Sequence, residues 1–304
     1  LASTGMPDTC GFYESTTNLW KCLELRDKLE AAGAYVMMSR TQSGPWPYEK
    51  VDGEYPDYTG AAYQQLPDFE KYNRGLLDIA DEAEANNMDY FISVHSNAAT
   101  EGNTVNYLSY FYRGNTDGTH VVPGAVDMCK RSWYHAFECR SMDGLEPTNY
   151  DTRDPETSKH ILADIDFYHS SYDATLPSSG KTYTGYLGVL HHGVPGFLVE
   201  GYFHTYQPAR HRALNPDYCK QEGIRYYRGI VDYFKAEPET KGYILGTVKD
   251  EHNAFVHDLY KYAPNTNDQY APLNGAVVTL TKENGDVVGT YTVDQNYNGL
   301  FYFP

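Results

Sequence analysis

The sequence has few cysteines and no paired cysteine motif. Thiolate zinc sites normally use a C-x-x-C pair, and no such pair occurs. The five cysteines are Cys10, Cys22, Cys129, Cys139 and Cys219. A thiolate metal site is therefore not expected, although Cys129 and Cys139 could form a disulfide in an exported chain.

Basic residues are also scarce. The 304 residues include 24 Lys and Arg against 41 Asp and Glu, which gives a formal net charge of −17. Nucleic-acid binding needs a basic surface that displaces counterions from phosphate. The charge balance therefore argues against a nucleic-acid partner, and any anionic polymer would have to be held by local chemistry.

Long hydrophobic runs are absent as well. No run reaches the roughly 20 apolar residues that cross a bilayer, so no membrane span is expected. Residues 1–5 carry neither the charged start nor the apolar stretch of a signal peptide. What the sequence does contain is 41% hydrophobic residues, as in folded proteins, and 30 tyrosines. Tyrosine in such numbers suits sugar-stacking grooves and β-strands alike.

Hydrophobic periodicity predicts alternating helices and strands over the first three quarters of the chain. The predicted helices cover residues 16–32, 67–83, 124–137 and 218–234. The predicted strands cover residues 35–39, 90–94, 104–112 and 196–199, while residues 42–66 and 141–184 read as irregular. This alternation predicts a layered α/β domain, with a mostly parallel central sheet and helices on both faces.

The composition changes at the polar stretch 236–240. Beyond it, residues 244–248, 276–280 and 287–293 read as strands, and Asn284-Gly285 reads as a hairpin turn. We therefore predict two domains, at residues 1–236 and 242–304. The second would be a small β-sandwich-like domain, incomplete because a sandwich needs more strands than these.

Ionisable residues follow two of the predicted buried strands. His95 comes directly after residues 90–94, and Glu200 comes directly after residues 196–199. The carboxyl edge of such strands is where ligands bind in open α/β sheets. A third candidate, Glu14, precedes the first helix. Histidine and carboxylate around one open position form a catalytic zinc arrangement, in which a further glutamate can move protons.

Five blocks of sequence occur in the order found in one enzyme family. They are Glu14, residues 34–41, Asn73-Arg74, ISVHSNA at 92–98 and PGFLVEGYF at 195–203. Together they resemble the zinc-dependent N-acetylmuramoyl-L-alanine amidases, with a match over residues 1 to about 235. The resemblance implies a hydrolase of peptidoglycan with one zinc ion, working in the periplasm or outside the cell.

The resemblance also implies roles for single residues. Glu14 and His95 would bind the zinc, and Glu200 would be the general base. The family's first histidine ligand would fall at or before Leu1, and no histidine precedes His95. We therefore expect the chain to be truncated or disordered there, the alternative being a family member that has lost its metal. Asn97 and His204 are candidate substrate contacts, with His204-Thr205 replacing the family's usual Ser-Asn.

The C-terminal part resembles the carboxypeptidase regulatory-like β-sandwich modules. Gly246-Thr247-Val248, residues 273–280 and residues 294–303 carry this similarity. Two other functions therefore remain open. A zinc carboxypeptidase would need an H-x-x-E pair, which is absent around Glu14. The other alternative is a non-catalytic wall-binding protein on an amidase scaffold.

Three further motifs are weaker. Residues 294–299 match half of an EF-hand loop but lack flanking helices, so a turn is expected. Gly180-Lys181-Thr182 lacks the first glycine of a phosphate loop. His191 and His192 are adjacent and in a strand would point to opposite faces, so they are not expected to bind one metal together.

Overall fold

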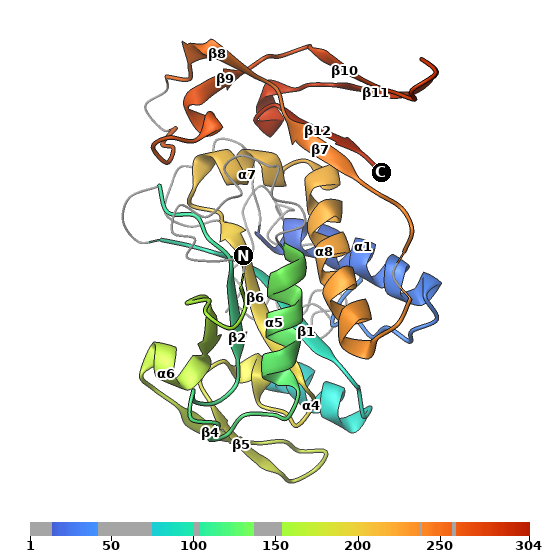
Figure 1. Ribbon diagram of the computed structural model, residues 1–304. Coiled ribbons are helices and arrows are strands. Elements are labelled where there is room, and N and C mark those ends of the chain that lie inside the picture. Colours follow the sequence, from blue (N-terminus) through green and yellow to red (C-terminus); the bar gives the residue numbers. More distant parts are fainter. Residues whose placement is uncertain (1–13, 42–74, 100–103, 137–153, 238, 257–259) are drawn as a thin grey trace, which may run out of the picture.

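A computed structural model of the protein describes residues 14–41, 75–99, 104–136, 154–237, 239–256 and 260–304. Its centre is a four-stranded sheet in the order β1-β6-β2-β3 (Figure 1). The strands are β1 (Phe91–Asn97), β2 (Ser109–Tyr112), β3 (Ile161–Ala163) and β6 (Gly196–Phe203). The pairs β1–β6 and β2–β3 are parallel, whereas β2–β6 is antiparallel. The sheet is therefore mixed but mostly parallel, as predicted.

Three helices cover one face of this sheet. They are α1 (Glu14–Ala31), α5 (Ala125–Ala136) and α8 (Pro216–Phe234). Phe197 and Val199 point to this face, where they join the largest hydrophobic cluster together with the fully buried Trp133 of α5. Alternate residues of β6 thus fill the core against these helices, as the period of two in a strand requires.

Smaller helices cover the opposite face. They are α4 (Leu76–Ala85), α6 (Asp164–Tyr168) and a short 3-10 helix, Gly188–Leu190. Leu198 and Phe111 point to this side and pack against Ile79, Leu190 and Tyr168. Helices on both faces of a central sheet give the layered α/β architecture that the sequence predicted.

Several local predictions need correction. Residues 35–39 form no strand, because no strand in the described part of the chain pairs with them. The strand predicted over 104–112 is limited to Ser109–Tyr112, and α7 (Gln207–Ala213) was not predicted. Of the region 141–184, which was predicted to be irregular, residues 154–184 are described, and they include β3, α6 and most of the hairpin of β4 (Tyr172–Thr175) with β5 (Thr182–Gly185). Short elements carry too few periodic residues to be recognised.

Some predictions fall on residues outside the described ranges. The irregular segment 42–66, the first part of the helix predicted from 67, Asn73-Arg74 and Cys139 belong to this group. The helix itself is described from Leu76 onward, as α4. Cys129 is a free thiol, fully buried in the core.

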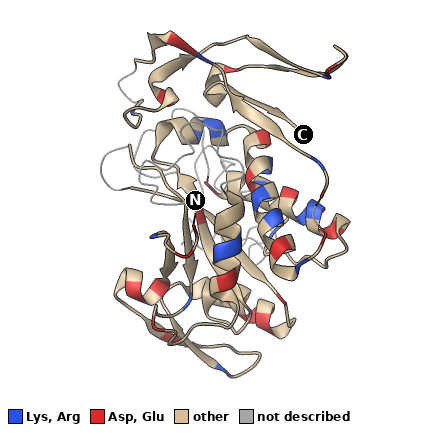
Figure 2. Ribbon diagram, viewed as in Figure 1, with Lys and Arg blue, Asp and Glu red and all other residues tan. Residues whose placement is uncertain are grey.

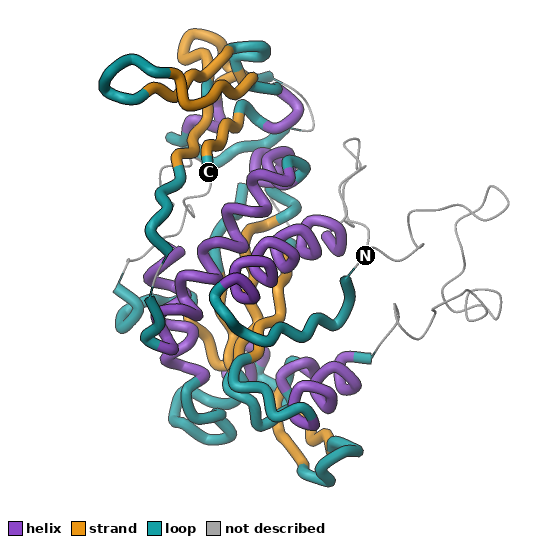
Figure 3. The backbone as a smooth tube through the Cα atoms, turned by 90° about the vertical axis from the view of Figure 1, so that its right-hand side faces the viewer, coloured by secondary structure: helices purple, strands orange, loops and turns teal. Residues whose placement is uncertain are grey.

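The C-terminal part consists of paired strands. It contains β7 (Ile244–Thr247), β8 (Lys249–Ala254), β9 (Tyr270–Pro272), β10 (Val277–Thr281), β11 (Val287–Thr292) and β12 (Leu300–Phe303). They pair antiparallel as β7–β12, β8–β9 and β10–β11. These strands lie at one end of the molecule, beyond α7 and the start of α8 (Figure 1), and the view from the side shows the same arrangement (Figure 3). All three strands predicted here are present, and Gly285 has the positive φ of 88° that its turn requires.

Charge is distributed unevenly over the elements. Basic residues are mainly on α1, α5, α7 and α8, whereas acidic residues are spread over the molecule (Figure 2). No helix within the described ranges is both long and apolar enough to cross a membrane.

Candidate functional site

The site lies where β1 and β6 end side by side. These two strands are parallel, and their register places His95 directly beside Glu200. Glu14, the first residue of α1, reaches the same edge, because the backbone N–H of Ser96 donates to its Oε1 at 2.8 Å. The structure therefore brings together the three residues that the sequence singled out from widely separated positions.

Glu14 is held as a carboxylate. Its Oε1 also accepts a hydrogen bond from Asn18 Nδ2 at 3.2 Å and lies 3.6 Å from His95 Nδ1. Burial by itself raises the pKa of Glu14, but the hydrogen bond and charge of His95, together with the Ser96 N–H, lower it to about 2. Glu14 is therefore charged throughout the physiological range.

His95 is fixed from its other side. Its Nε2 lies 3.0 Å from Ser93 Oγ, which leaves Nδ1 directed at Glu14. Burial lowers the pKa of His95, but this is outweighed by the hydrogen bond that His95 donates to Glu14 and by the charges of Glu200 and Glu14, so its pKa is raised overall. The Ser93 hydroxyl at Nε2 thus orients the ring, so that the other ring nitrogen, Nδ1, faces the Glu14 carboxylate.

Glu200 differs from Glu14 in its surroundings. Its Oε2 is buried and has no hydrogen-bond partner among the described residues. Burial raises the pKa of Glu200 to about 7, with a contribution from the charge of Glu14, while His95 and Lys21 act in the opposite direction. Two carboxyl groups at one edge thus have pKa values far apart, an arrangement suited to acid–base chemistry near neutral pH.

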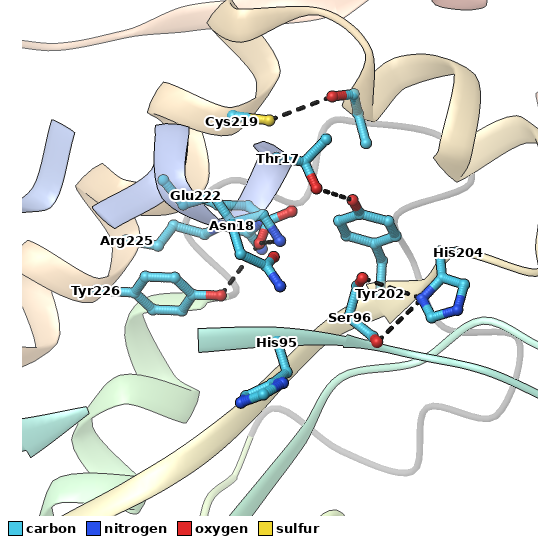
Figure 4. A network of polar contacts seen from close by, with 12 residues as sticks. Thr17, Asn18, His95, Ser96, Tyr202, His204, Cys219, Glu222, Arg225 and Tyr226 are labelled. Carbon is cyan, nitrogen blue, oxygen red and sulfur yellow. Dashed lines mark hydrogen bonds and ion pairs between the residues drawn. The ribbon is translucent and has the colours of Figure 1, made fainter. Parts of the chain in front are cut away.

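His204 and Asn97 lie at the end of the site. His204 Nδ1 lies 3.1 Å from Ser96 Oγ and 3.0 Å from the Ser96 carbonyl oxygen (Figure 4). The His204 N–H donates to the Asn97 carbonyl at 2.8 Å. Burial lowers the pKa of His204. The His204 side chain is therefore engaged within the protein, while Asn97 is partly exposed.

A buried ion pair lies behind the site and was missed in the sequence. Lys21 Nζ is 3.0 Å from Glu222 Oε2, and neither side chain is exposed. A Cβ atom on Gly201 of β6 would lie 2.4 Å from that same Glu222 oxygen, so only glycine allows the pair to approach the strand. Spacing along the first helix could have pointed to Lys21 in the sequence. Asn18 and Lys21 follow Glu14 by four and seven residues, so they share its helix face.

The donor atoms can be compared with a zinc site. Two ligands of tetrahedral zinc lie about 3.4 Å apart at ordinary bond lengths, close to the 3.6 Å between Glu14 Oε1 and His95 Nδ1. The Ser93 hydroxyl on the second nitrogen of His95 matches the outer support that metal-binding histidines usually have. Within the described ranges, however, no group of three or more His, Cys, Asp and Glu side chains could hold a metal ion. The residues present thus supply two ligands of the expected set.

The weaker motifs have structural roles. His191 is fully buried, and its Nε2 lies 3.1 Å from the Tyr172 carbonyl oxygen, on the face of the sheet covered by α4. Asp294 accepts a hydrogen bond from the Asn296 N–H at 2.7 Å and begins a short 3-10 turn, Gln295–Tyr297, with no flanking α-helix. The expected turn is thus found at 294–299.

Comparisons with known proteins point in one direction. A family model described as N-acetylmuramoyl-L-alanine amidase matches residues 3–232. No curated protein sequence matches the chain. Among solved structures, an N-acetylmuramoyl-L-alanine amidase from Clostridium difficile is 18% identical over 79% of this chain and 91% of its own, with a TM-score of 0.47. An N-acetylmuramyl-L-alanine amidase from Mycobacterium smegmatis is 13% identical over 77% and 83%, with a TM-score of 0.49. The CwlD amidase of Clostridioides difficile, in complex with the GerS lipoprotein, is 17% identical over 74% and 88%, with a TM-score of 0.45.

Proposed function

Because the chain belongs to the N-acetylmuramoyl-L-alanine amidase family, we propose that it hydrolyses the amide bond between the lactyl group of N-acetylmuramic acid and L-alanine in peptidoglycan. The observation that carries this proposal is the meeting of Glu14, His95 and Glu200 at one sheet edge. The Glu14 carboxylate is fixed there by hydrogen bonds, while Glu200 has a buried oxygen without a hydrogen-bond partner among the described residues.

Glu14 and His95 are the residues that would hold zinc. Glu14 is ionised and His95 is oriented by Ser93, so both present ligand atoms toward the same point. Zinc, when bound there, supplies Lewis-acid polarisation of the amide carbonyl and a lower pKa for a bound water. Catalytic zinc typically has three protein ligands, of which Glu14 and His95 would be two.

Glu200 would move the proton. In amide hydrolysis the attacking water loses a proton and the leaving nitrogen of L-alanine gains one, so a single carboxyl group can accept the first and donate the second. A pKa of about 7 leaves Glu200 partly ionised at neutral pH, able to act in both directions.

The substrate determines where the protein would work. Peptidoglycan lies outside the cytoplasmic membrane, so we propose a site of action in the periplasm or outside the cell. The chain's charge of −17 would repel an anionic wall polymer, so binding would rest on local contacts at the site. Asn97, at the partly exposed end of β1, is the first candidate for such a contact.

The direct test is hydrolysis of a purified muramoyl peptide, followed by mass spectrometry. The expected products are a free lactyl carboxylate and a peptide with a free amine on L-alanine. Activity should disappear with a chelator and return with zinc. Release of the C-terminal amino acid of the stem peptide would indicate a carboxypeptidase instead. Binding to wall fragments without cleavage at any zinc concentration would favour a non-catalytic wall-binding protein.

A further inference from the structure

A cluster of buried polar groups joins the C-terminal strands to the α/β domain. Oδ1 of the Asp268 carboxylate accepts hydrogen bonds from Arg212 Nη1 at 2.7 Å and from Asn298 Nδ2 at 3.0 Å. Its Oδ2 accepts a hydrogen bond from the Tyr206 hydroxyl at 2.8 Å. Asp268 and Arg212 are fully buried, and Tyr206 is nearly so. Both oxygens of one carboxylate are therefore used to join segments distant in sequence.

Tyr206 is the central member of this cluster. Besides donating to Asp268, its hydroxyl accepts a hydrogen bond from the Ala263 N–H at 3.1 Å. Two residues of the C-terminal part are therefore hydrogen-bonded to this one oxygen atom. The ring packs in the hydrophobic cluster that also contains Leu245 and Leu300 from β7 and β12. The C-terminal part thus contributes both polar and apolar contacts to the residue.

The other side of the same loop faces the candidate site. Tyr206 follows Glu200 by six residues and comes shortly after the end of β6. Its neighbours contact the end of β1, because the His204 N–H donates to the Asn97 carbonyl at 2.8 Å and Thr205 Oγ1 accepts the Ala99 N–H at 3.0 Å. Residues 204–206 therefore lie between the site and the C-terminal strands, bonded to both.

We propose that Asp268 is a positioning residue for the site: through Tyr206 it fixes residues 204–206, and with them the ends of β1 and β6. The C-terminal part thereby belongs to the catalytic unit, because it keeps residues 204–206 in place beside the site. The catalytic consequence rests on the proposed amidase function, whereas the positioning itself does not.

The physical reason lies in the kind of contact. A buried ion pair adds little net stability over an apolar pair, but it tolerates few geometries, because each charge must keep its partner. Asp268 meets Arg212, Asn298 and Tyr206 at once, so these groups can shift only together. Catalytic geometry is sensitive to this, since a displacement of about 1 Å can cost about 100-fold in rate.

The test compares two tyrosines that both attach the C-terminal part. Tyr206→Phe removes the hydroxyl that binds Asp268 and Ala263. Tyr291→Phe is the matched control, because the Tyr291 hydroxyl accepts from Asn215 at 2.8 Å and lies 3.2 Å from Asp217, at the start of α8 and away from residues 204–206. Both variants lose one hydroxyl at the junction, but the Tyr206 hydroxyl is buried and the Tyr291 hydroxyl is only partly buried. A loss of overall stability alone would accelerate amide exchange throughout the α/β domain, whereas a loss of positioning would accelerate it at residues 204–206 and at the end of β1.

We expect Tyr206→Phe to lower kcat on a muramoyl peptide by about 10-fold, with KM and zinc content little changed, and Tyr291→Phe to stay within about 2-fold of the wild type. Amide hydrogen exchange at Ala99 and His204 should accelerate in Tyr206→Phe alone, since those amides make the bonds described above. Equal exchange and equal kcat in both variants would overturn the proposal. If the wild type hydrolyses nothing, the amidase function fails, while the exchange measurement still decides the positioning.

Discussion

Lys21 and Glu222 form an ion pair in which neither side chain is exposed to solvent, with Nζ and Oε2 3.0 Å apart. Lys21 also lies over the ring of Tyr202, 4.3 Å from its centroid, and Tyr226 donates a hydrogen bond to Glu222 at 3.1 Å. The pair joins α1, which begins with Glu14, to α8, directly behind the strand that carries Glu200. The pair thus joins two helices that pack behind the candidate site.

Breaking this pair should be costly. Lys21→Met leaves the Glu222 charge buried without its main partner, so the free energy of unfolding should fall by about 3–5 kcal/mol. Adding Glu222→Leu should recover most of the loss, because the second charge is then removed. Urea denaturation measures both. Lys130→Met, in a pair that is 30% and 66% exposed, is the control and should change stability by less than about 1 kcal/mol. A similarly small effect for Lys21→Met would contradict the prediction.

Glu200→Gln tests the proton-transfer role. The change preserves size and removes the carboxylate, so fold and zinc content should be retained while the rate falls by about 10²–10⁴. Zinc content, melting temperature and muramoyl-peptide hydrolysis are measured on one sample. Lost zinc would instead make Glu200 a ligand, and activity that falls in step with unfolding would make it structural. Normal turnover would exclude the role altogether.

The raised pKa of Glu200 also predicts a pH dependence of stability. The folded protein holds the Glu200 proton up to about pH 7, whereas the ordinary value is 4.5. This contribution is therefore complete below pH 4.5 and is lost as the pH rises through 7. In metal-free protein, the wild type should lose stability relative to Glu200→Gln over that interval, by about 3 kcal/mol. Denaturation at several pH values with a chelator present measures it, and parallel curves for the two proteins would refute it.

Asn18 should support the metal site without touching the metal. Its Nδ2 donates to Glu14 Oε1 at 3.2 Å, so Asn18→Ala removes one of the two hydrogen bonds, from Asn18 and from the Ser96 N–H, that hold that carboxylate. We expect zinc affinity to fall by about 10- to 100-fold, the usual effect of losing an outer-shell partner. Competition with a chromophoric chelator gives the affinity. Asn86→Ala, an exposed change at the end of α4, is the control, and equal affinities in the two variants would count against the assignment of Glu14.

The proposed boundary between residues 1–236 and 242–304 can be tested by cutting the chain. Residues 235–237 and 240–242 are exposed and lie outside any helix or strand, so limited proteolysis should cleave there first. The two fragments should nevertheless elute together on gel filtration, because Arg212–Asp268 and a shared hydrophobic cluster join them. First cleavage inside 196–235 would argue against the boundary, and separate elution would argue against the tight junction.

The main elements of the α/β domain could be predicted because their patterns are long. Helices α5 and α8 and strands β1 and β6 each show a clear period or a buried apolar run. The elements that were missed or extended too far are short, such as α6 with five residues and β3 with three. Residues 35–39 have strand-like composition, yet composition cannot supply the hydrogen-bonded neighbour that a strand requires.

For the site, the sequence by itself determined that His95 and Glu200 stand at the ends of buried strands and that Glu14 stands at the start of the first helix, and so singled out these three residues. Only the tertiary structure decided their electrostatics, because the pKa of a carboxyl group depends on burial and on neighbours from other elements. Glu14 and Glu200 are the same residue type, yet their pKa values are about 2 and about 7. The tertiary structure likewise decided that Asp268 lies against Tyr206 and Arg212, since contacts between such distant positions follow from packing and leave no periodic signal in the chain.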